Sequence, residues 1–154
     1  MHKIIRVIVK GNDEEEAREN AENMVNDLAE RNKYGIDYGS FFFEKDSSVS
    51  GIGRWGNMPP IVPLRSKQGA KYVLQALLWD FTDFKESLKK VEDLIKKSPT
   101  DLFSAGFELY HFEKVYEREW VLFEHDMIGP RELRYIVEHE WQNKYWVLPC
   151  DVHT

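Results

Sequence analysis

A glycine-rich stretch at residues 51–56, with the sequence GIGRWG, holds the first residues whose types and spacing suggest chemistry. Its letters match the G-x-G-x-x-G loop of dinucleotide-binding proteins, but that loop must leave a buried strand and open a helix. Serines precede the stretch and residues 57–60, with two prolines, follow it, so we expect no helix to open there. A kinase glycine-rich loop and a P-loop are also absent. The pattern therefore disfavours nucleotide binding by this stretch.

The same stretch and its surroundings carry side chains that suit the binding of an anion. Glycines allow backbone N–H groups to approach a ligand closely, arginines supply positive charge, and an indole offers a stacking plane. We therefore predict that a small anionic ligand or a protein partner binds a set formed by Arg54, Trp55, Asn57 and Arg65. The alternative is a surface loop that Trp55 and the neighbouring prolines anchor against the core.

The last third of the chain holds most of its histidines and its single cysteine. Cys150 and His153 have a spacing that can hold a metal, but a zinc site needs further ligands from elsewhere in the fold. A bound divalent ion would lower the pKa of a water molecule and support hydrolysis. The alternative function is therefore a metal-assisted hydrolase. Its candidate residues are His111, His125, Asp126, His139, Cys150 and His153.

Nucleophilic catalysis has little basis in this sequence. The serines near residue 50 lack a G-x-S-x-G setting. His125 and Asp126 are adjacent on an expected strand, so they would point to opposite faces. Cys150 is expected to be a small buried apolar residue at a strand end, and His153 to be solvated. We therefore expect a non-catalytic binding or interaction domain without a cofactor, with the enzyme as the alternative.

Composition and charge limit the classes of protein to which the chain can belong. With 154 residues and 42% hydrophobic residues, one domain covering residues 1–154 is expected. The net charge of −6 disfavours nucleic-acid binding, because proteins that grip phosphate backbones show a basic face. One cysteine allows no intramolecular disulfide. Without a signal-peptide core or a membrane-length apolar run, we expect a soluble, cytoplasmic protein.

The longest periodic segment, residues 66–97, is the element against which the rest of the fold must be built. Its apolar residues recur in two interleaved series with a step of seven, which predicts a helix with one apolar stripe. Leu74, Phe81 and Leu88 are expected to be buried against a sheet. A break at residues 80–83 remains an alternative to one continuous helix. Heptad spacing also allows a seam between two chains, so a homodimer through this helix or an edge strand is considered.

The elements before this helix are predicted by local patterns. β-Branched residues predict a strand at 2–10, and Asp13 with Glu16 predicts a capping box for a helix that continues to about Arg31. A second strand is expected at 36–45, with three phenylalanines at its centre. An irregular loop, rich in glycine and proline, follows at about 46–65, and long loops of this kind are often functional.

The elements after the long helix complete the predicted fold. Apolar residues predict strands at 100–112, 115–126 and 144–152, and a third helix beginning near Pro130 with Ile136 and Val137 on its buried side. The resulting order is β-α-β-loop-α-β-β-α-β. It predicts an α+β fold with a mainly antiparallel or mixed five-stranded sheet, helices packed on it, and ferredoxin-like character.

Overall fold

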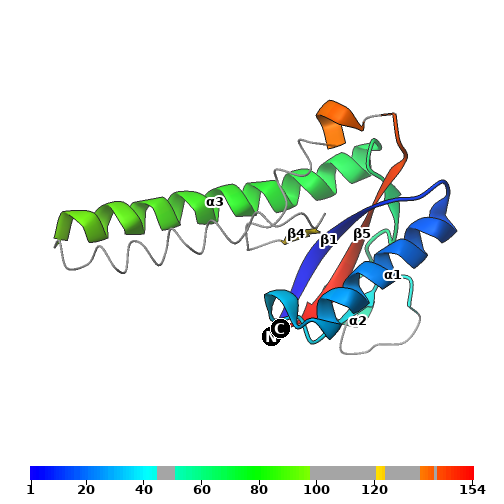
Figure 1. Ribbon diagram of the computed structural model, residues 1–154, viewed down its shortest axis with the longest axis horizontal. Helices are drawn as coiled ribbons and strands as arrows, with labels where there is room; N and C mark the ends of the chain where they lie inside the picture. Colours follow the sequence, from blue (N-terminus) through cyan, green and yellow to red (C-terminus); the bar gives the residue numbers. More distant parts are fainter. Residues whose placement is uncertain (45–50, 98–120, 124–135, 141) are drawn as a thin grey trace.

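The computed structural model describes residues 1–44, 51–97, 121–123, 136–140 and 142–154 (Figure 1). These residues form an α+β fold in which an antiparallel sheet separates two apolar clusters. One cluster packs beneath α1 (Glu14–Glu30), and the other packs beneath the first turns of α3 (Lys67–Lys97). The expected α+β class and the antiparallel sheet are therefore confirmed.

The sheet is centred on two long strands, one from each end of the chain. β1 (His2–Lys10) pairs with β5 (Tyr145–His153) along its whole length, so that His2 lies opposite His153 and Lys10 lies opposite Tyr145. The strand expected at 2–10 is confirmed at both ends, and the strand expected at 144–152 is shifted by one residue. β-Branched and other apolar residues on both faces suit strands that are buried on both sides.

Shorter strands flank this central pair. β4 (Val121–Phe123) pairs with β1, and β2 (Tyr38–Phe41) pairs with β5, which gives the order β2-β5-β1-β4. A short strand that was not predicted, β3 (Val62–Pro63), pairs with the other end of β5. The ferredoxin-like order is not confirmed.

Pro149 occupies a gap in the pairing of β5. On the side of the sheet edge, β2 pairs with residues 150–153 and β3 pairs with Val147 and Trp146. Among the described residues, neither strand reaches Pro149. Because proline has no backbone N–H to donate, it is tolerated where a strand has no partner to bind. The gap therefore explains how a proline fits within a long inner strand.

Helix α1 begins as predicted, with a small difference in its cap. Oδ1 of Asp13 accepts a hydrogen bond from the backbone N–H of Glu16 at 3.0 Å. The Glu16 carboxylate accepts from the N–H of Asn12 at 2.7 Å, one residue before the cap. The helix packs closely, because a Cβ atom on Gly39 of β2 would lie 2.4 Å from a methyl group of Val25.

The second strand is shorter than predicted, because its apolar run continues into a turn. β2 ends at Phe41, and the backbone N–H of Glu44 donates to the Phe41 carbonyl at 3.1 Å. The Ser40 hydroxyl donates to the Glu44 carboxylate at 2.8 Å and closes the same turn. Phe42 is buried within it. The strand expected over 36–45 is therefore confirmed only at Tyr38–Phe41, since a buried turn can be as apolar as a strand.

Helix α3 is continuous through residues 80–83, so the alternative of a break is excluded. It extends as an arm well beyond the sheet (Figure 1). Leu74 is 57% exposed and Leu88 is 43% exposed, so the expected burial of both is wrong. The side chain of Phe81 lies outside the described residues. The residues that α3 buries near the sheet are Tyr72, Val73 and Ala76.

The contacts made by the first turn of α3 explain how this helix is rotated about its own axis. A Cβ atom on Gly69 would lie 2.3 Å from the Pro63 carbonyl oxygen, so the helix backbone rests directly on the chain at β3. The Tyr72 hydroxyl donates to the Pro59 carbonyl at 3.1 Å. These contacts turn Val73 toward the sheet, and the next residue lies about 100° further around the helix. Leu74 is therefore exposed.

Several predicted elements lie wholly or partly outside the described residues. The strand expected at 100–112 is outside them, and the strand expected at 115–126 is described only at β4. Within the third expected helix, residues 136–139 are helical. Ile136 is buried as expected, but Val137 is exposed. No helix in the described ranges is both long and apolar enough to cross a membrane.

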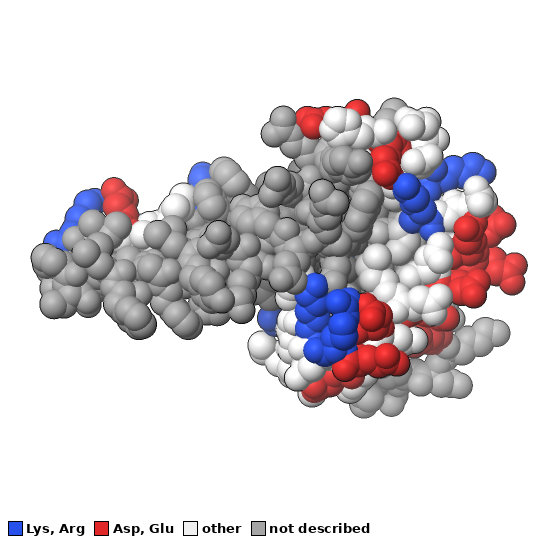
Figure 2. Space-filling model, in the orientation of Figure 1, with Lys and Arg blue, Asp and Glu red and all other residues white. Residues whose placement is uncertain are grey.

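Charges of both signs are mixed on the described surface. On the face shown in Figure 2, lysine and arginine side chains lie beside aspartate and glutamate side chains. Ion pairs one helical turn apart contribute to this pattern, such as Lys96 with Glu92 at 3.0 Å and Arg18 with Glu14 at 3.9 Å. Exposed pairs of this kind contribute little to stability.

Candidate functional site

The glycine-rich stretch forms one turn of helix, which corrects the expectation that no helix opens there. α2 (Ile52–Trp55) begins after Gly51 and ends before Gly56, and these two glycines have positive φ angles of 50° and 80°. Such angles favour glycine because it has no Cβ atom. The turn ends before Gly56, whereas the third glycine of a dinucleotide-binding motif lies in a helix that continues and packs on the strand, so that arrangement is still not met.

A buried carboxylate fixes the start of this loop. The backbone N–H of Gly51 donates to Oδ2 of Asp151 in β5 at 2.9 Å. Oδ1 of Asp151 lies 3.1 Å from Nδ1 of His2 in β1, and the aspartate side chain is fully buried. A buried carboxylate is costly unless it is hydrogen-bonded, and here it has donors from a strand and from the loop. The loop is therefore attached to the centre of the sheet.

The loop then follows β5 to its other end. The backbone N–H of Leu64 donates to the Tyr145 carbonyl at 2.8 Å, and Nη2 of Arg65 lies 3.5 Å from the Asn143 carbonyl oxygen. Tyr145 and Asp151 are about 20 Å apart along an extended strand. Arg65 is therefore separated from the part of the loop that begins at Gly51.

The predicted binding set is accordingly divided between two places. Arg54, Trp55 and Asn57 follow Gly51 closely and are exposed, while Arg65 lies at the far end of β5. Arg54, Trp55 and Asn57 therefore lie near one another, and Arg65 does not lie with them.

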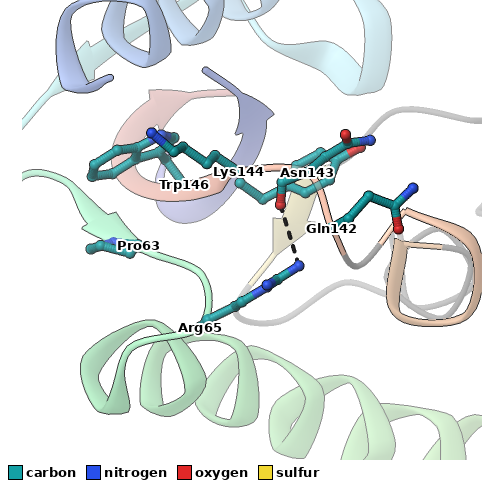
Figure 3. A pocket seen from close by; sticks show the side chains of 7 residues that line it. Pro63, Arg65, Gln142, Asn143, Lys144 and Trp146 are labelled. Atoms are coloured by element: carbon teal, nitrogen blue, oxygen red, sulfur yellow. Dashed lines mark hydrogen bonds between the residues drawn. The ribbon is translucent and has the colours of Figure 1, made fainter. Parts of the chain in front are cut away.

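Arg65 borders a pocket of about 340 Å³, which we call the Arg65 pocket (Figure 3). In Figure 3 the Arg65 side chain rises from the loop toward Asn143, and the Trp146 ring forms another wall. Tyr145 also contributes to the lining. The other lining residues are Pro63, Arg65, Gln142, Asn143, Lys144 and Trp146. A guanidinium, two side-chain amides and an indole ring can together bind a small planar anion.

Two hydrogen bonds fix the wall of the Arg65 pocket opposite the loop. Nζ of Lys144 donates to the Asn12 carbonyl at 3.0 Å, and Nε1 of Trp146 donates to the Gly11 carbonyl at 2.9 Å. Both acceptors belong to the turn between β1 and α1. This wall is therefore held in place before any ligand binds.

A charged network lies beside the Arg65 pocket at Tyr145. Nζ of Lys10 lies 2.6 Å from Oε2 of Glu140, and the Tyr145 hydroxyl donates to the same oxygen. Burial, followed by the bond to Glu140, raises the pKa of Tyr145 to about 12. The bond to Lys10 lowers the pKa of Glu140, and the same bond raises the pKa of Lys10. Tyr145 is therefore a neutral phenol and not a catalytic base near neutral pH.

The predicted metal ligands are dispersed where they are described. Cys150 is fully buried, and burial raises the pKa of its thiol well above the usual value. His139 is exposed, and His153 pairs with Asp37 at 2.9 Å. Within the described ranges no group of three or more His, Cys, Asp or Glu side chains is arranged to hold a metal. His111, His125 and Asp126 lie outside those ranges.

Sequence reasoning missed two groups of residues that the sheet assembles. The first is the wall of the Arg65 pocket at residues 142–146, which pairing between β3 and β5 brings to the loop. The second consists of His2 in β1 and Asp37 just before β2, which meet Asp151 and His153 of β5. The predicted strands at both chain ends were the only available signal, because they allowed residue 2 and residue 153 to become neighbours.

Comparison with known proteins gives a family but no activity. A family model described as "Domain of unknown function (DUF7995)" matches residues 1–154, which is the whole chain. No curated protein and no solved structure matches this chain. The family's description states no function, so a functional proposal depends on the geometry of this chain.

Proposed function

For this chain, which belongs to the DUF7995 family, we propose a function in binding a small anionic ligand in the Arg65 pocket. The observation that carries this proposal is a pocket with two cationic residues, Arg65 and Lys144, in its lining and no carboxylate among the lining residues that the structure describes. Two amide side chains, Gln142 and Asn143, add neutral donors and acceptors. Such a lining favours a negative ligand over a positive one.

The chemistry of the lining suggests a carboxylate or a phosphate attached to a flat organic group. A guanidinium binds either anion through two parallel N–H groups, which fixes the orientation of the anion. The Trp146 ring provides an apolar plane for the remainder of the ligand. The volume of about 340 Å³ lies at the lower end of the range for small-molecule sites. A ligand of metabolite size is therefore proposed.

A thermal-shift screen with carboxylates and phosphates tests this proposal, and calorimetry then measures the affinity of each hit. Arg65→Gln is expected to weaken binding by roughly tenfold or more, because hydrogen bonds to charged groups contribute about 1.5–3 kcal/mol. Arg54→Gln is the matched control, since it removes the same charge from another exposed position of the same loop. Equal binding by both variants and the wild type would contradict the proposal.

The exposed end of the loop is a second candidate, for a protein partner. Trp55 is 38% exposed on a helical turn whose first glycine is fixed by Asp151. Exposed tryptophan and arginine side chains are frequent at the centres of protein interfaces. If Arg54→Gln removes the binding of peptide carboxylates and Arg65→Gln does not, this surface is the binding site.

Self-association through α3 is also proposed as a property of the chain. Leu74 and Leu88 are exposed on a helix that extends beyond the sheet, and they are two heptads apart. Sedimentation velocity over a wide concentration range tests this directly. A monomer at the highest concentration would remove the proposal.

A further inference from the structure

Two histidines, His2 and His153, lie directly opposite each other on β1 and β5. Side chains of opposite residues in an antiparallel pair point to the same face of the sheet. The ring centroids are 5.2 Å apart, and the ring planes are 76° to each other. The two side chains are 17% and 36% exposed, so both rings border one partly open surface.

Each ring has a carboxylate at its Nδ1 atom. Nδ1 of His2 lies 3.1 Å from Oδ1 of Asp151, and Nδ1 of His153 lies 2.9 Å from Oδ2 of Asp37. A carboxylate accepts a hydrogen bond from Nδ1 when that nitrogen carries the ring proton. In a neutral ring the lone pair is then on Nε2. Proteins orient metal-binding histidines in this way, with the second ring nitrogen bonded to a carboxylate.

Other groups around the pair restrict the rings further. The Tyr38 ring on β2 stacks on His153 with a centroid distance of 5.3 Å. The amino nitrogen of Met1 lies 3.4 Å from Nε2 of His153, so an ion that binds this Nε2 takes the place of the amino group. The buried position of Asp151 prevents its carboxylate from turning to solvent. The neighbouring groups therefore hold both histidine rings in place, while part of each ring remains accessible to solvent.

We propose that the Nε2 atoms of His2 and His153 bind one divalent transition-metal ion, with water molecules completing its coordination. Imidazole nitrogen is a preferred ligand of Zn²⁺, Ni²⁺ and Cu²⁺. Two protein ligands are fewer than the three or four of ordinary zinc sites, so the metal is exchangeable and does not determine the fold. The pair lies at the end of β5 away from the Arg65 pocket, and the proposal is independent of the anionic ligand.

A competition titration with a chromophoric chelator tests the site, using tag-free full-length protein and Zn²⁺ or Ni²⁺ alone. One ion per chain is expected for the wild type. His2→Gln and His153→Gln are each expected to weaken binding at least tenfold. His139→Gln is the matched control, because it removes an exposed histidine elsewhere on the surface and should leave the affinity unchanged.

Two further measurements keep the test decisive if a histidine variant fails to fold. Asp37→Asn retains both metal ligands and is expected to weaken binding roughly 10- to 100-fold, as loss of a partner of a metal-binding histidine does. Ring-nitrogen NMR of the wild type should show Zn²⁺ shifting the Nε2 resonances of His2 and His153. The proposal is overturned if these resonances do not move, or if His139→Gln alone abolishes binding.

Discussion

The carboxylate of Asp151 accepts a hydrogen bond at 2.9 Å from the backbone N–H of Gly51, although the two residues are 100 positions apart in the sequence. This bond joins the start of the irregular loop to the last strand. Since the loop then runs along β5 to Arg65, the bond also determines which loop residues lie at which end of the sheet. The division between the exposed turn at Arg54 and the Arg65 pocket follows from it.

Removal of this carboxylate should destabilise the protein. Asp151→Ala leaves the Gly51 N–H and the His2 ring without their buried acceptor, which typically costs about 1–3 kcal/mol. Asp37→Ala is the control, because that carboxylate is largely exposed and should change stability by about 0.5 kcal/mol or less. Urea unfolding measures both. Equal losses in the two variants would show that the buried bond has no special importance.

The close contact of α3 with the chain at β3 predicts an unfavourable Gly69→Ala substitution. In an open helix this change stabilises by roughly 1 kcal/mol. Here the new Cβ atom would lie 2.3 Å from a backbone oxygen of Pro63, so we expect destabilisation of about 1–3 kcal/mol. Lys71→Ala, on the exposed side of the same turn, should have little effect. A stabilised Gly69→Ala variant would mean that the helix does not rest on this segment.

The rotation of α3 can be tested with two neighbouring residues. Val73 is buried against the sheet, and Leu74 is mostly exposed. Val73→Ala should therefore cost about 1–2 kcal/mol, whereas Leu74→Ala should change stability by about 0.5 kcal/mol or less. Chemical unfolding of the monomeric protein gives both values. The reverse order would indicate that the helix turns its leucine stripe toward the sheet, as the heptad pattern alone suggests.

The phenol of Tyr145 predicts a specific loss of stability in strong alkali. Its pKa is raised from 10.0 to about 12 in the folded state, so the unfolded chain loses this proton at lower pH than the folded chain does. The stabilisation is complete below pH 10 and is lost as the pH rises from 10 to about 12. Thermal unfolding across this range should show a steeper fall for the wild type than for Tyr145→Phe. Ultraviolet titration of the folded wild type should show one tyrosine that ionises at a higher pH than the others. Parallel stability curves for the wild type and Tyr145→Phe would contradict this prediction.

Elements governed by local patterns were predictable from the sequence. The strand at 2–10 follows from its β-branched residues, and the start of α1 follows from Asp13 and Glu16. The rotation of α3 was not predictable, because heptad spacing describes the helix alone. Its orientation depends on Gly69 resting against Pro63, a contact that exists only after β3 has paired with β5.

The candidate site was predictable only in part, for the same reason. Arg65 was predicted to bind an anion because its side chain is positively charged, and the structure places it at a pocket. Its neighbours at 142–146 are almost 80 positions away, and strand pairing brings them together. No sequence motif indicated His2 or Asp37 as site residues, because their partners are set by the register of β5 against β1 and β2.

The most direct test of the proposed function is an NMR titration of ¹⁵N-labelled protein with the tightest anion from the screen. Binding in the Arg65 pocket should shift the indole resonance of Trp146 and the side-chain amides of Gln142 and Asn143. The indole resonance of Trp55, on the exposed turn of the loop, serves as the internal reference and should remain in place. Shifts at Trp55 with no change at Trp146 would contradict the account and place the ligand at the other end of the loop.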